Sequence, residues 1–87
     1  MKIKDGFMLR EIAGNWVVVP IGQRVVDFNG LMTLNESGVL LWKKLEHGAS
    51  REELISSILD EYDVETAIAE NDVDEFVNGL KDKEIIV

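Results

Sequence analysis

The stretch VVDFNGLMTLNESGVLLW, residues 25–42, contains the change from strand-type to helix-type sequence on which the fold depends. Its first part has two short strand-like runs on either side of Asn29 and Gly30, a pair that readily takes the positive φ angles of a type I′ turn. Its second part begins at Asn35, a good helix N-cap residue, and continues with apolar residues at helical spacing. The stretch therefore predicts a β-hairpin that leads directly into a helix.

The second arm of this hairpin, residues 31–34, has two faces because side chains alternate along a strand. Met32 and Leu34 share one face, which we expect to lie against the core. Thr33 is then exposed, and Leu31 is at least partly exposed. This strand comes last before the helices, so it is expected to form an edge of the sheet whose free amides and carbonyls can accept another chain.

The residues before this stretch also read as β-structure. An apolar-rich run at residues 7–12 is followed by a turn signal at Gly14 and Asn15, and then by the β-branched and aromatic run at residues 16–19. Pro20 cannot donate to a ladder and is expected at the end of a strand or at an edge. Together with the hairpin, these runs predict a small antiparallel sheet.

The residues that follow predict three helices with short connections. Gly48 is expected to end the first helix, a capping box at residues 50–53 to begin the second, and the third to run from residues 63–66 to about residue 83. The tail, residues 84–87, is either a last strand or a docked end. The expected buried faces carry Val39, Leu41, Trp42 and Leu45, then Leu54, Ile55, Ile58, Leu59 and Tyr62, then Ala69, Val73, Phe76, Val77 and Leu80. We therefore expect an α+β fold, a small N-terminal antiparallel sheet followed by three helices, as a single domain over residues 1–87.

Composition argues against several classes of function. The 87 residues contain no cysteine and one histidine, so neither a Cys-based zinc site nor a multi-His metal site is available. No phosphate-binding loop, dinucleotide fingerprint or nucleophile–base arrangement is present, so we expect no catalytic residue, no metal and no cofactor, and hence no enzyme. The net charge of −8, from 17 acidic against nine basic residues, disfavours a nucleic-acid partner. No run is apolar enough for a membrane span and residues 1–6 lead into no signal-peptide core, so a cytoplasmic protein is expected.

Two features of the helices suggest a binding surface. Leu40 lies outside the buried stripe of the first helix, although a single exposed leucine is ordinary in a soluble protein. In the third helix, Ile68, Asp72, Glu75 and Gly79 fall on one stripe, separate from the centre of the buried face. A glycine inside a helix costs stability, and here it would leave a backbone notch beside two acids.

The sequence resembles the PqqD-like family, named for the small protein D of pyrroloquinoline quinone biosynthesis. The resemblance extends from about residue 7 to residue 87. It is carried by residues 28–38, Leu41-Trp42, residues 45–48, residues 50–54, residues 62–64, residues 72–76 and Leu80. It implies a winged-helix-like, non-catalytic peptide recognition element, or peptide chaperone. Such domains bind the leader of a ribosomally made precursor peptide and present it to a tailoring enzyme in trans, often a radical SAM protein.

The resemblance also implies a place for the peptide. In the family the leader adds as a strand beside the third strand of the sheet and packs on the third helix. Carried onto this chain, the peptide-binding residues are Leu31, Met32, Thr33 and Leu34 of the strand and Ile68, Asp72, Glu75 and Gly79 of the last helix.

Two other functions fit the same pattern of elements. A protein–protein adaptor or oligomerisation domain would also use the exposed edge strand, which is compatible with a homodimer. A winged-helix DNA-binding regulator is disfavoured, because its recognition helix would need arginine and lysine at outer positions where this chain has mostly acids.

Overall fold

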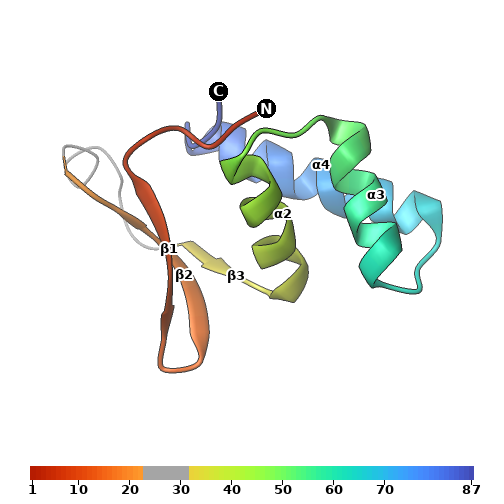
Figure 1. Cartoon of the computed structure of the whole chain (residues 1–87), viewed down its shortest axis with the longest axis horizontal. Coiled ribbons are helices and arrows are strands. Elements are labelled where there is room, and N and C mark those ends of the chain that lie inside the picture. The colour runs from red at the N-terminus through yellow and green to blue at the C-terminus, as the bar shows by residue number, and fades with distance from the viewer. Residues whose placement is uncertain (23–31) are drawn as a thin grey trace.

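The computed structural model describes residues 1–22 and 32–87. Three antiparallel strands come first: β1 (Phe7–Ile12), β2 (Asn15–Pro20) and β3 (Met32–Leu34). Three helices follow: α2 (Glu36–Glu46), α3 (Arg51–Glu61) and α4 (Thr66–Asp82). The α+β fold predicted from the sequence is therefore confirmed. Figure 1 shows the sheet at one end of the molecule and the helices at the other, with α2 next to the sheet.

The hairpin of β1 and β2 is closed by a two-residue turn at Ala13 and Gly14, whose φ angles are 52° and 81°. Both values are positive, as a type I′ turn requires. The turn was predicted at Gly14 and Asn15, one residue later. Asn15 is instead the first residue of β2 and pairs with Ile12.

Strand β3 pairs with β2 and completes the order β1-β2-β3. Met32 and Leu34 are partly buried and pack against the core, whereas Thr33 is exposed, as the alternation predicted. The hairpin turn predicted at Asn29 and Gly30 lies outside the described residues, as does Leu31.

Helices α2 and α3 begin and end close to the predicted positions because their caps are made by neighbouring residues. The Oδ1 atom of Asn35 accepts a hydrogen bond from the amide of Gly38 at 2.8 Å. Ser50 and Glu53 form the predicted capping box. Gly48, at φ 89°, follows the C-cap residue of α2 in the left-handed conformation.

The core lies between the sheet and the three helices. Trp42, Leu45, Leu54 and Leu80 are fully buried in it, together with Val18 of β2. Three side chains predicted to be buried are only partly so and pack against the rim of the core: Leu59, Tyr62 and Phe76.

The C-terminal tail docks on the N-terminal segment rather than joining the sheet. Ile86 forms an isolated antiparallel bridge with Ile3, and Ile85 and Ile86 are both buried. The two ends of the described chain therefore lie close together, as Figure 1 shows. None of the helices in the described part of the chain is long and apolar enough to cross a membrane.

Candidate functional site

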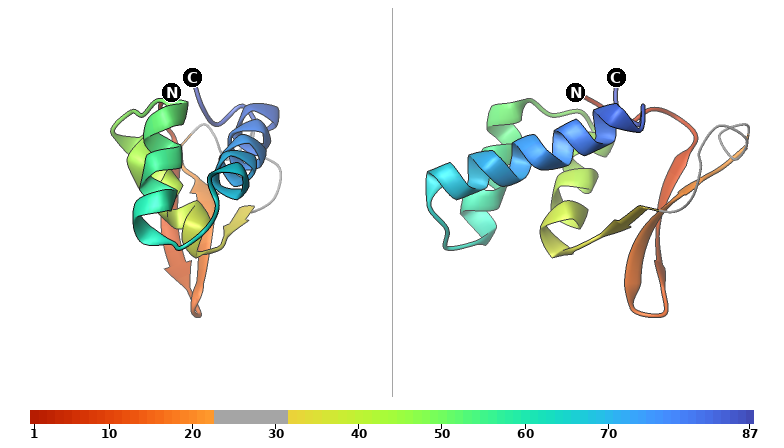
Figure 2. Two further views of the ribbon diagram at one scale, coloured as in Figure 1. Left: turned by 90° about the vertical axis from the view of Figure 1, so that its right-hand side faces the viewer. Right: turned by 180° about the vertical axis from the view of Figure 1, so that it is seen from behind.

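The outer edge of β3 is open among the described residues. Strand β2 covers one side of β3, and no described strand pairs with the other. The left view of Figure 2 shows β3 on the same side of the molecule as α4. An unpaired strand edge beside a helix is a place where an extended chain can bind.

The register identifies which residue of β3 presents its backbone to this edge. Hydrogen-bonded pairs alternate with non-bonded pairs along an antiparallel ladder. The amide of Ile21 donates to the carbonyl oxygen of Gly6 at 2.8 Å, so Val17, four residues earlier, also directs its backbone groups toward β1, where it pairs with Arg10. Val17 is also the partner of Thr33 in β3. Because the backbone groups of Val17 are used by β1, the N–H and C=O of Thr33 point away from β2, toward the open edge.

Beyond the end of β3, the surface continues as two neighbouring cavities between α4 and the start of α2. Both are lined by Asn35, Ser37 and Asp72. The first, of about 370 Å³, extends over the apolar side chains of Ile58, Tyr62 and Val64. The second, of about 300 Å³, extends over Gly38, Leu41, Glu75 and Phe76. We call these the Tyr62 cavity and the Phe76 cavity. A chain paired with β3 and continuing past Leu34 would reach both.

The predicted site residues of α4 are only partly brought together by the structure. Asp72 lines both cavities and Glu75 lines the Phe76 cavity. Ile68 lines neither, although half of its surface is exposed. Gly79 also lines neither, and a Cβ atom added to it would meet no heavy atom within 4 Å. The backbone of α4 is thus uncovered at Gly79, as a notch requires, but this notch lies apart from the two cavities.

Several lining residues were not predicted as part of the site. Phe76 and Tyr62 were assigned to the core on their helical spacing, and their partial exposure at its rim makes them available to a ligand. Asn35 was predicted only as a helix N-cap, and Ser37 was given no role of its own; in the structure the hydroxyl group of Ser37 donates to Oδ1 of Asn35 at 3.0 Å. A cap residue at the end of an edge strand is a signal that could have indicated this position.

The acidic residues of α4 are in different electrostatic surroundings. Asp74 accepts hydrogen bonds from Nε and Nη2 of Arg51 at 2.7 and 3.0 Å. These bonds hold the pKa of the Asp74 carboxyl below its ordinary value and raise the pKa of Arg51. Asp72 and Glu75 have no ion-pair partner among the described residues. Within the described part of the chain, Asp72 and Glu75 therefore line the cavities without a cation, as does Glu36 at the start of α2, which lines the Tyr62 cavity.

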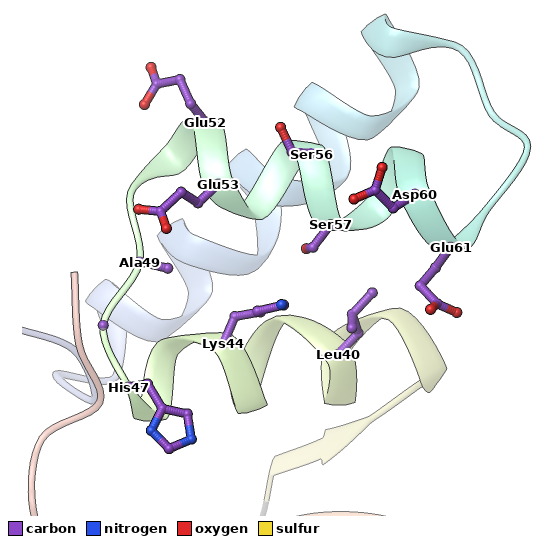
Figure 3. Close-up of a pocket in the computed structure, with 11 residues that line it drawn as sticks. Leu40, Lys44, His47, Ala49, Glu52, Glu53, Ser56, Ser57, Asp60 and Glu61 are labelled. Carbon is purple, nitrogen blue, oxygen red and sulfur yellow. The ribbon is translucent and has the colours of Figure 1, made fainter.

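A separate groove of about 610 Å³ lies between α2 and α3. Figure 3 shows Leu40 and Lys44 of α2 pointing toward α3, and Ser57 of α3 pointing toward α2. Leu40, expected outside the buried stripe, is partly buried here and packs against the core. This groove shares no lining residue with the Tyr62 and Phe76 cavities, and no described residue of α4 lines it.

Binding is the chemistry that this arrangement supports best. Within residues 1–22 and 32–87, no three His, Asp or Glu side chains gather in a way that could hold a metal ion. The β3 edge and the two cavities offer backbone hydrogen bonds, apolar surface and unpaired carboxylates, which are the means of recognising an extended peptide.

Comparison with known proteins gives the family. The family model for coenzyme PQQ synthesis protein D (PqqD) matches residues 15–86. The chain belongs to the PqqD family. No curated protein sequence matches it.

Two solved structures share this PqqD fold. One is TbiB1 in complex with the TbiA(beta) leader peptide, with a TM-score of 0.77 and 29% identity over 98% of this chain and 93% of that one. The other is lasso peptide synthetase B1 complexed with the leader peptide, with a TM-score of 0.75 and 21% identity over 97% of this chain and 93% of that one. Because its identity is only 21%, the second structure supports the fold alone.

Proposed function

We propose that this PqqD-family protein binds the leader of a ribosomally synthesised precursor peptide as an added strand on β3, without catalysing a reaction itself. The observation that carries the proposal is the edge of β3 that no described strand covers, where the N–H and C=O of Thr33 point away from β2. The likeness to TbiB1, whose structure is a complex with a leader peptide, supports it.

The proposed path of the leader follows the predicted residues. The leader pairs with the backbone of Leu31, Met32, Thr33 and Leu34, and its side chains lie against Ile68, Asp72, Glu75 and Gly79. Main-chain hydrogen bonds supply affinity that depends little on the leader's sequence, and pockets for alternate side chains supply specificity. On this chain the Tyr62 and Phe76 cavities are such pockets.

The bound leader is presented to a tailoring enzyme that acts in trans, and a radical SAM protein is the partner we propose. A leader held along β3 and α4 leaves the opposite surface of α2 and α3 uncovered. A second protein can therefore contact the complex without displacing the leader.

The test is titration of the protein with the leader of a candidate precursor peptide. We expect backbone amide signals of residues 32–34 and of α4 to shift in the NMR spectrum. The fluorescence of Trp16, which pairs with Leu34, should change as well, while the fully buried Trp42 contributes a constant signal. Amide shifts that avoid both β3 and α4 would refute the proposed site.

A proline substitution separates main-chain pairing from side-chain contact. Thr33→Pro removes an amide that points to the open edge, so it should abolish leader binding while β2 and β3 stay paired. Thr33→Ala keeps the amide and should bind almost as the wild type does. Retained binding by a folded Thr33→Pro variant would show that the leader does not pair with this strand.

A further inference from the structure

The two cavities beyond β3 combine apolar surface with negative charge. Asp72 lies where they meet, and Glu75 follows it at a spacing of three residues, so both carboxylates are on the same face of α4. The first cavity is apolar on its far side, where Ile58, Tyr62 and Val64 line it. Glu36, at the start of α2, adds a third carboxylate to the lining of the Tyr62 cavity. A peptide that crosses this region therefore meets an apolar pocket together with several carboxylates.

The carboxylates of Asp72 and Glu75 differ from that of Asp74, which is used in a contact between two helices. Asp74 is paired with Arg51, which joins α4 to α3. Asp72 and Glu75 face the cavities instead and have no cation within reach among the described residues. Like charges at this spacing repel each other mildly, and a cation bound between them relieves that repulsion.

We infer that the leader carries a lysine or arginine near an apolar residue, and that Asp72 and Glu75 bind the basic side chain while the apolar one enters the Tyr62 cavity. This inference rests on the proposed function, because it specifies the ligand of the same site. The complementarity extends to the whole molecule, whose net charge of −8 favours a basic ligand over an acidic one.

Charge and apolar contact have different parts in this recognition. The carboxylates accept charge-assisted hydrogen bonds, which are shorter and stronger than neutral ones. Because both carboxylates are exposed, the gain is modest and falls as salt screens it. The contribution of the apolar side chain in the Tyr62 cavity to the binding free energy is not screened by salt. Salt dependence therefore distinguishes the two contributions.

The experiment uses twelve-residue peptides selected on the intact protein from a random display library. We expect the recovered sequences that shift the amide signals of residues 32–34 to be enriched in lysine or arginine beside an apolar residue. Replacing that basic residue by methionine should weaken binding to the wild type about three- to tenfold at low salt. The same replacement should change binding to an Asp72→Asn, Glu75→Gln variant less than about twofold.

A variant with the same change of charge elsewhere provides the control. Asp60→Asn with Glu61→Gln alters two carboxylates of the groove between α2 and α3, and it should behave like the wild type. Peptides that shift residues 32–34 but bind equally well without their basic residue would overturn this inference and leave the proposed function intact. Failure of every selected peptide to shift residues 32–34 would overturn the proposed function itself.

Discussion

Replacing Gly79 by alanine is expected to stabilise the protein. Gly79 lies within α4, where glycine costs roughly 0.5–1 kcal/mol relative to alanine because its backbone loses more freedom on folding. It does not have the positive φ angle that favours glycine elsewhere in the chain. The added methyl group would meet no heavy atom within 4 Å, so no clash opposes the gain.

A change of this size is measurable in a small domain. One kcal/mol shifts the melting temperature of a domain of 60–100 residues by roughly 4–8 °C, so Gly79→Ala should raise it by about 2–8 °C. Urea unfolding should show a higher midpoint with an unchanged slope. Gly48→Ala is the matched control and should destabilise the protein, because Gly48 has a φ angle of 89°. A lower or unchanged melting temperature for Gly79→Ala would refute this reasoning.

The same position also tests how far the leader runs along α4. If the leader crosses the notch, Gly79→Leu should weaken leader binding more than Gly79→Ala does, because a larger side chain fills the uncovered surface. Both variants should remain folded. Unchanged affinity of the Gly79→Leu variant would remove Gly79 from the proposed site and confine the leader to β3 and the two cavities.

Two further predictions concern stability. Asn35→Ala removes the side-chain oxygen that caps α2 and should lower the free energy of unfolding by about 1 kcal/mol. Urea unfolding measures this change, and an unchanged midpoint would show that the cap does not stabilise the protein. Arg51 lowers the pKa of Asp74, so their pair should stabilise the fold above the unfolded-state pKa of about 4 and lose this contribution as the pH falls through the lower folded value. Asp74→Asn should therefore reduce the acid sensitivity of unfolding, and an unchanged pH profile would show that the pair does not contribute.

The features of the fold that could be predicted from the sequence are those fixed by neighbouring residues. Asn35, Ser50 and Gly48 act within one turn of the chain, so their residue types alone indicated where the helices begin and end. The first hairpin turn was misplaced by one residue because Ala13 takes a φ angle of 52°. Alanine rarely adopts that conformation, and its sequence gives no signal for it.

The site was less predictable because it depends on how separate elements meet. The stripe on α4 follows from helical spacing, but spacing does not say which part of the stripe faces β3. From Ile68 to Gly79 the helix rises about 16 Å, whereas the three residues of β3 extend only about 10 Å. The cavities accordingly include Asp72 and Glu75, from the middle of the stripe, and neither of its ends. The outward direction of the Thr33 backbone likewise depends on the hydrogen bonds between β1 and β2, which residue types do not reveal.

The charge of the site bears on the choice between a leader peptide and a protein partner at the β3 edge. A second copy of this chain could pair along the same edge, but it would bring the same net charge of −8. Its own Asp72 and Glu75, also without a cation, would add to the repulsion near the open edge. A short peptide with a basic side chain forms the same main-chain hydrogen bonds, and its positive charge is attracted by the carboxylates that would repel a second copy. Because strand pairing alone does not discriminate between these partners, we propose that the carboxylates of Asp72 and Glu75 provide the discrimination and favour a basic leader over a second copy of the chain.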